Sequence, residues 1–151
     1  MATKRRSLTT KKAVQRKERR AAFAETTPRA IKRAAGATTT SETPLHVRAP
    51  GLVLEDGLRE YARQRTGFRI GKFGLEITRV SVRFEDISGP KGAPVYDCRI
   101  KVVLRTAPDV MVSQSDETQR AAFDKAVGAA ERAVRRTLER KDRTAKRARA
   151  R

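Results

Sequence analysis

Positively charged side chains with helical spacing are the residues of this chain best suited to chemistry, and that chemistry is the binding of phosphate. Six of them recur at intervals that place them in one stripe of a helix: Lys125, Arg132, Arg136, Arg140, Arg143 and Arg147. Only Glu139 and Asp142 interrupt the last nineteen residues with negative charge. Exposed helices usually intersperse acidic residues as i,i+4 partners of the basic ones. The pattern therefore favours contact with nucleic acid over an ordinary solvated face.

Residues with the types and spacing needed for catalysis are scarce. His46 is the single histidine of the chain and has no obvious nucleophile beside it in the sequence. Cys98 alternates with apolar neighbours, which indicates a small buried side chain rather than a reactive thiol. No metal-binding, glycine-loop or paired-carboxylate motif is present. We therefore expect a protein that is not an enzyme and that needs no cofactor, no metal and no small-molecule substrate.

The charge of the chain is concentrated at its two ends. Of a formal net charge of +19, the first 44 residues hold twelve basic against three acidic side chains. The last 17 residues hold nine against two, whereas the 90 residues between them are nearly balanced, with fifteen against twelve. Such ends attract a polyanion, and nucleic acid is the default partner. No apolar run is long enough for a membrane span, and one cysteine fits a reducing compartment, so we expect a cytoplasmic protein without a membrane partner.

Composition divides the chain into three parts. Residues 1–44 are predicted to be a disordered basic arm and linker, because they hold too few apolar side chains to offset the entropy of ordering. The same Arg-rich, acid-poor composition is shared by organelle transit peptides, which leaves targeting as a second interpretation of the arm. Residues 45–143 are predicted to form one folded domain, and residues 144–151 a basic C-terminal tail.

Within the middle part, the apolar pattern changes several times. A short strand is predicted at 45–48, followed by a helix from Leu54 in which Leu54, Leu58, Tyr61 and Phe68 share one face, with glycines at 71 and 74 ending it. Alternation then predicts strands at 80–85, 96–104 and 110–113, the last two as an antiparallel hairpin, with 88–94 as a loop.

A long helix follows the last strand. Thr118 or Asp116 is suited to cap its first turn. Its apolar residues fall in one narrow stripe, opposite the basic one, and are Phe123, Val127, Ala130, Val134 and Leu138. The helix thus has one face for a sheet and one for a partner. The predicted order is β-α-β-β-β-α, an α+β fold.

Several local strings in this order resemble the ribosome hibernation promoting factor and ribosome-associated inhibitor A family. Residues 57–62 resemble the family's "LREY" opening of the first helix, and residues 77–82 the strand that follows. Residues 121–126 resemble the core of the second helix, and residues 132–141 its basic continuation. The resemblance covers residues 45 to 143.

This resemblance implies a four-stranded sheet with two helices packed on one face, similar to a double-stranded RNA-binding domain. It also implies binding in the small ribosomal subunit near the decoding region, where the ribosome is reversibly silenced. No second domain follows the long helix in this sequence, so we expect the short form of the family, with the arm as an addition. The expected partners are the small subunit and its rRNA, bound by a monomer.

The expected RNA-binding residues are Arg59, Arg63, Lys125, Arg132, Arg135, Arg136, Arg140 and Lys141. Arg83, Arg99, Lys101 and Arg105 on the outer sheet face have Glu85 and Asp97 among them, and we expect cross-strand neutralisation there. Two other functions remain open. One is a general binder of structured RNA or DNA that uses the same helix. The other is a protein-interaction module whose basic tails bind an acidic partner, although the chain has few aromatic anchors for it.

Overall fold

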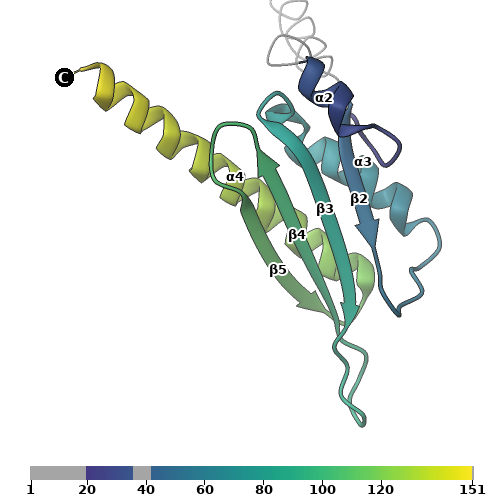
Figure 1. The fold of residues 1–151 in the computed structure, drawn as a ribbon. Coiled ribbons are helices and arrows are strands. Elements are labelled where there is room, and N and C mark those ends of the chain that lie inside the picture. The colour runs from purple at the N-terminus through teal and green to yellow at the C-terminus, as the bar shows by residue number, and fades with distance from the viewer. Residues whose placement is uncertain (1–19, 36–41, 151) are drawn as a thin grey trace, which may run out of the picture.

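The computed structural model describes residues 20–35 and 42–150, which form a mixed α+β fold (Figure 1). A five-stranded sheet is flanked by three α-helices and one short 3-10 helix in this part of the chain. The elements in order are β1 (Phe23–Ala24), α2 (Arg29–Ala35), β2 (Thr43–Arg48), α3 (Leu58–Ile70), η1 (Gly71–Phe73), β3 (Ile77–Asp86), β4 (Tyr96–Leu104), β5 (Val110–Asp116) and α4 (Gln119–Arg149).

The strands lie in the sheet in the order of the sequence, β1-β2-β3-β4-β5. β1 pairs in parallel with β2 and β2 in parallel with β3, whereas β3, β4 and β5 form antiparallel hairpins. The parallel pair β2–β3 is connected by α3, as a crossover between parallel strands requires. The predicted hairpin of β4 and β5 is confirmed, and β5 continues three residues beyond its predicted end, to Asp116.

Helices α3 and α4 lie side by side across one face of the sheet (Figure 1). The alternating residues of β3 and β4 that face them are buried, and Phe84 is fully enclosed. Phe123 of α4 packs between the ring of Phe84, at 6.3 Å, and that of Tyr61 of α3, at 6.1 Å and edge-on. The apolar stripe of the long helix therefore packs on the sheet as its spacing predicts.

The structure corrects the predicted four-stranded sheet with two helices, because the N-terminal arm adds the strand β1 and the helix α2. Phe23 is 1% exposed, and its neighbour Ala21 is also buried. The apolar patch around Phe23 thus buries enough surface to order this part of the arm. The disorder predicted for the arm is wrong for residues 20–35, while residues 1–19 and 36–41 lie outside the described residues. The boundaries predicted for a domain at 45–143 stay a prediction.

Two glycines after α3 make room for the arm. A Cβ atom built on Gly74 would lie 2.2 Å from the Cβ of Ala21, and one built on Gly71 would lie 2.8 Å from the Ala21 carbonyl oxygen. The Ala21 amide donates a hydrogen bond of 3.0 Å to the Gly71 carbonyl. The sequence indicated these glycines only as the end of a helix. In the structure they also leave the space in which Ala21 of the arm packs.

The first helix begins later than predicted and exposes one aromatic side chain. Gly57 precedes α3 with φ at +73°, a left-handed conformation that favours glycine, so the helix starts at Leu58 rather than Leu54. Phe68 was expected on the buried face but is 60% exposed. The guanidinium groups of Arg20 and Arg65 lie 5.4 and 5.7 Å from its ring centroid. Arg20 of the arm therefore covers part of the Phe68 ring, which the core leaves exposed.

The long helix α4 has 31 residues and runs to Arg149, so residues 144–149 of the predicted basic tail are helical. Thr118 caps it, as predicted: its side-chain oxygen accepts a hydrogen bond of 3.1 Å from the Ala121 amide. At about 1.5 Å per residue the helix is roughly 46 Å long, and its C-terminal part projects beyond the sheet (Figure 1).

Candidate nucleic-acid interface

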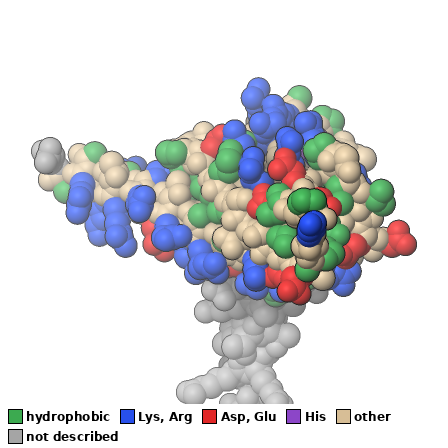
Figure 2. All heavy atoms as spheres, turned by 90° about the horizontal axis from the view of Figure 1, so that it is seen from below, with side chains coloured by type: hydrophobic (Ala, Val, Ile, Leu, Met, Phe, Trp, Pro, Cys, Tyr) green, Lys and Arg blue, Asp and Glu red, His purple; other side chains and the backbone are tan. Residues whose placement is uncertain are grey.

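Basic side chains follow the exposed side of α4. The residues of α4 that pack on the sheet are buried up to Val134, and the stripe opposite them carries the cations (Figure 2). Three exposed arginines stand one turn apart in this stripe: Arg132, Arg136 and Arg140. Among the residues that the structure describes, none of their guanidinium groups has an ion pair or side-chain hydrogen bond. We call these three residues the arginine ridge.

The other five predicted site residues have partners within the fold. Arg63 lies 2.5 Å from the Glu60 carboxylate, and Lys125 lies 2.5 Å from that of Asp116. Arg135 pairs with Glu131 at 3.0 Å, and Lys141 pairs with Glu76 at 3.4 Å. Arg59 donates hydrogen bonds to the Glu25 carboxylate and the Val47 carbonyl.

These basic partners lower the pKa of the acidic groups that they contact. The hydrogen bonds that Arg63 and Gln64 donate to Glu60 lower the pKa of its carboxyl to about 2. The hydrogen bond from Lys125 likewise lowers the pKa of Asp116. Both acids therefore stay ionised at neutral pH, and each offsets much of the positive charge beside it. The paired residues offer a phosphate less net charge than the arginine ridge does.

The structure does not bring Arg59 and Arg63 beside the arginine ridge. Tyr61 faces α4, where its hydroxyl donates a hydrogen bond of 2.7 Å to Asp124. Arg59 and Arg63 are each two residues from Tyr61, which puts them about 160° around α3 from the side that meets α4. Arg59 instead ties the loop after β1 to β2. The role of both residues in RNA binding stays a prediction.

Three basic residues of α3 and η1 that are not among the expected RNA-binding residues do face α4. Arg65 lies 3.7 Å from Asp124, and Arg69 and Lys72 lie 3.3 and 2.6 Å from the carboxylate of Glu131. Their spacing of four and three residues, which is that of one helical face, could have revealed them. Because Arg69, Lys72 and Arg135 share the single carboxylate of Glu131, the junction of the two helices keeps an excess of positive charge.

Glu131 is the acidic centre of that junction. Its side chain is 13% exposed, and burial by itself would raise its pKa. The hydrogen bonds and charges of Lys72 and Arg69 outweigh burial and leave the pKa of Glu131 below its usual value. The carboxylate therefore stays ionised and holds α3 and α4 together at the surface.

The outer face of the sheet is neutralised only in part. Arg83 pairs with Glu85 at 2.6 Å, and Lys101 pairs with Asp109 at 3.3 Å. Asp97, which was expected to neutralise this face, accepts a hydrogen bond from Ser113 instead. The cross-strand register places Arg99 opposite Arg83. Arg83 is therefore neutralised within its own strand and Lys101 by the residue that precedes β5, and neither ion pair is the cross-strand neutralisation that the sequence predicted.

The groups suited to catalysis are placed as the sequence suggests. Cys98 is fully buried in β4, and this burial raises the pKa of its thiol far above the usual value. His46 lies half-buried in β2, opposite Ser81 of β3. Within residues 20–35 and 42–150, no group of His, Cys, Asp and Glu side chains could hold a metal ion. No helix in the same part of the chain is long and apolar enough to cross a membrane.

Sheet, helices and arginine ridge together define a small α+β protein with a cationic helical surface suited to a phosphate backbone. The chain matches the Sigma 54 modulation protein / S30EA ribosomal protein family over residues 45–142, and it belongs to that family. This is the family of ribosome hibernation and modulation factors that the sequence strings resemble, so the predicted family is confirmed. Its members are ribosome-associated regulators of translation.

No curated protein matches the chain. Among solved structures it is similar to the N-terminal domain of Protein Y from Thermus thermophilus, with 22% sequence identity and a TM-score of 0.47. That similarity covers 60% of this chain and 93% of the Protein Y chain.

Proposed function

We propose that this protein binds the small ribosomal subunit through rRNA phosphates and reversibly silences translation near the decoding region. The observation that carries the proposal is the arginine ridge. Arg132, Arg136 and Arg140 are exposed, one turn apart, and without acidic partners among the described residues. Positive charge that the fold leaves unneutralised is available for a polyanion.

In this mechanism the protein acts by occupying a binding site on the small subunit, and it catalyses no chemical step. Arginine guanidinium groups form bidentate hydrogen bonds with phosphate oxygens. The rigid helix presents them in a row that fits against a folded RNA backbone, and this recognises shape rather than bases. Once bound near the decoding region, the domain would fill space that mRNA and tRNA need. The resemblance to hibernation factors supports this location.

Affinity should depend steeply on salt. Each neutralised phosphate contributes about 0.9 to the slope of log affinity against log salt for a duplex. With roughly six contacts, the affinity falls by about a factor of 10³ between about 50 and 200 mM salt. Salt therefore provides a natural means of release, which fits a reversible inhibitor.

Two triple variants with the same change of charge test the ridge. The first, R132Q/R136Q/R140Q, removes the unpaired arginines, and the second, R63Q/K125Q/R135Q, removes paired ones. Sedimentation with small subunits through a sucrose gradient at moderate salt should show loss of co-migration for the first and a clearly smaller loss for the second. Equal losses would mean that only net charge matters, and retention by both would exclude the ridge as the binding surface.

A general binder of structured RNA is the second candidate, and the composition of the ridge is the observation that favours it. Its guanidinium groups contact backbones of any sequence, and no aromatic platform for stacking bases lies among them in the described part of α4. Affinity for a random RNA duplex equal to that for small subunits, without loss of in vitro translation, would decide for this candidate.

The proposal extends to partners and location. The protein acts as a monomer away from the ribosome, in the cytoplasm where ribosomes work, and it takes no small-molecule substrate. Analytical ultracentrifugation of the free protein checks the first point, because a dimer would double the sedimenting mass.

A further inference from the structure

The outer face of the sheet carries arginines that stand side by side on three strands. In β2, β3 and β4 buried residues alternate with residues that face away from α3 and α4, and Arg48, Arg83 and Arg99 are exposed members of the second set. The register places Arg48 beside Arg83 and Arg83 opposite Arg99. Helices α3 and α4 lie behind the sheet in Figure 1, so this face is turned toward the viewer. We call these three residues the cross-strand arginines.

Residues of like charge stand opposite each other on this face. Two acidic residues, Glu85 and Asp97, form a pair of their own two positions along the same strands. Among the residues that the structure describes, Arg83 has an ion pair of 2.6 Å with Glu85, whereas Arg48 and Arg99 have neither an ion pair nor a side-chain hydrogen bond. Like charges directly opposite each other destabilise a sheet. The free protein therefore keeps an unfavourable arrangement of charge that a bound anion would relieve.

The cross-strand arginines suit a phosphate backbone. Neighbouring strands are about 4.8 Å apart, so adjacent guanidinium groups can share one phosphate, and the three together can follow a backbone that runs across the strands. A protein partner would need apolar anchors in addition to charge. Met111 is the one large hydrophobic residue that is exposed on the described strands. The face offers positive charge and hydrogen-bond donors with little apolar surface, which favours RNA over an acidic protein segment.

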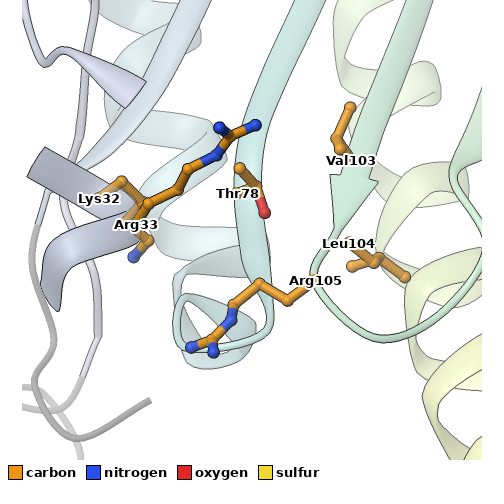
Figure 3. A pocket seen from close by; sticks show the side chains of 6 residues that line it. All are labelled: Lys32, Arg33, Thr78, Val103, Leu104 and Arg105. Carbon is orange, nitrogen blue, oxygen red and sulfur yellow. The ribbon is translucent and has the colours of Figure 1, made fainter. Parts of the chain in front are cut away.

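The end of the sheet next to α2 does not extend this surface. A cavity of about 350 Å³ lies there. Figure 3 shows Arg33 extending from α2 toward β3, whereas Arg105 points in another direction, so the two guanidinium groups do not converge on one ligand. The arginines that do stand together on the sheet are the cross-strand arginines.

We propose that the cross-strand arginines bind a second RNA backbone, so that the protein bridges two RNA segments on opposite sides of the domain. The arginine ridge lies on the side of α4 that is turned away from the sheet, and the cross-strand arginines lie on the side of the sheet that is turned away from α4. The bridge rests on the proposed binding of RNA by the arginine ridge. Binding at the cross-strand arginines does not depend on it.

The double variant R48Q/R99Q tests this surface when it is made in a protein that already lacks the arginine ridge, R132Q/R136Q/R140Q. Binding of a short RNA duplex by the full-length protein is measured by fluorescence anisotropy across a salt series. The two added changes should weaken binding about tenfold or more. They should lower the slope of log affinity against log salt by about 1.8, which is about 0.9 for each lost contact.

The matched control is K91Q/R120Q in the same background. It removes the same charge from exposed residues outside both surfaces, one in the loop between β3 and β4 and one in the first turn of α4. Its affinity should fall clearly less. Equal falls for the two double variants would mean that net charge alone matters, and an unchanged affinity of R48Q/R99Q would contradict the surface.

The single variant R99Q separates binding from folding. Without RNA its thermal midpoint should equal or exceed that of the wild type, because the change removes a like-charge pair with Arg83. Added RNA should raise the midpoint of the wild type more than that of R99Q. A midpoint of R99Q below that of the wild type would contradict the inferred repulsion.

Energy transfer between two RNA duplexes, one with a donor dye and one with an acceptor, tests the bridge when RNA is in excess over protein. The wild type should give transfer. R48Q/R99Q and the ridge variant should each lose it while still binding one duplex. Transfer that R48Q/R99Q retains would overturn the bridge. A ridge variant that binds a duplex as tightly as the wild type would instead contradict the proposed function of the ridge, and the cross-strand arginines would still be judged by R48Q/R99Q.

An oligoglutamate peptide with as many charges as the RNA distinguishes the kind of partner. The RNA should bind at least about tenfold more tightly, because each phosphate accepts bidentate hydrogen bonds along a regular backbone. Equal affinities, with equal losses in R48Q/R99Q, would assign the surface to an acidic protein segment and overturn its assignment to RNA.

Discussion

The two halves of α4 share one periodic sequence and have different environments. All of its buried residues lie between Gln119 and Val134, whereas residues 142–149 are exposed throughout. In the first half the apolar stripe packs on β4 and β5. The stripe ends with the half-buried Leu138, and beyond it only the basic stripe continues. The comparison shows that a helix whose first half is packed in the core can extend basic side chains beyond the sheet without disturbing the packing of the core.

Different forces stabilise the two halves. The first half gains from burial of apolar surface and from its cap. The second half depends on intrahelical bonds, and some of its neighbours repel each other, since Arg136 and Arg140, and again Arg143 and Arg147, are i,i+4 pairs of like charge. Bound phosphates would relieve that repulsion, so the second half gains most from a polyanion.

The largest effect on stability is expected from Phe123→Ala in the first half. The ring is fully buried between α3 and the sheet, and its loss should lower the free energy of unfolding by about 3–5 kcal/mol. Leu138→Ala, at the half-buried edge of the same stripe, should cost clearly less. Urea unfolding followed by circular dichroism measures both, and equal losses would mean that packing extends further along α4 than the structure shows.

Glu131→Gln tests the ion cluster at the boundary between the halves. The change removes the shared partner of Arg69, Lys72 and Arg135, and it should cost about 1–3 kcal/mol at neutral pH. Because the folded-state pKa of Glu131 is lowered, its contribution is present above the unfolded pKa and is lost as the pH falls through the folded value. The wild type should therefore lose more stability on acidification than the variant.

Glu139→Gln is the control for the second half, with the same change of charge at an exposed position. Its effect on unfolding at pH 7 should stay within about 0.5 kcal/mol. A loss as large as that of Glu131→Gln would show that the effect of Glu131→Gln comes from the change of net charge and not from the ion cluster.

Much of this contrast could be predicted from the sequence, because α4 is long and strongly periodic. The apolar stripe from Phe123 to Leu138 and the cap at Thr118 are patterns of residues close in sequence. They predict the helix and its packed face without knowledge of the rest of the fold. The arginine ridge follows from the same periodicity. The partners of the other basic residues could be predicted only in part. Glu60 for Arg63 and Glu131 for Arg135 follow from helical spacing. Asp116 for Lys125 and Glu76 for Lys141 come from other elements and have no local signal.

The arm shows where sequence reasoning failed. Its composition indicates disorder, yet Phe23 is buried because Gly71 and Gly74, which follow Ala21 by 50 and 53 residues, leave space for Ala21. Such a contact has no local signature. The same limit explains Phe68, whose position on the helix suggested the core and whose ring faces Arg20 of the arm instead.

Thr118→Ala should have a moderate effect that is confined to the start of α4. The hydroxyl accepts the Ala121 amide hydrogen bond, and its removal should cost about 1 kcal/mol of unfolding free energy. Thr118→Ser keeps the oxygen and should recover most of this loss. If both variants behave alike, the cap contributes nothing and the methyl group of threonine is responsible.

The smallest effect on stability is expected from Arg143→Ala in the second half, within about 0.5 kcal/mol. If this residue contacts a phosphate, the slope of log affinity against log salt for small subunits should nevertheless fall by about 0.9. Fluorescence anisotropy across a salt series measures the slope. An unchanged slope would limit the interface to residues before Arg143.

The burial of Cys98 has a practical consequence for such measurements. A thiol with no exposed surface and a raised pKa hardly reacts with maleimides or with another thiol. A single cysteine introduced on the projecting part of α4 would then be the one site within residues 20–35 and 42–150 that takes a dye or a crosslinker. Single cysteines placed at successive positions of this helix can therefore be crosslinked to the groups that each position contacts, without first replacing Cys98.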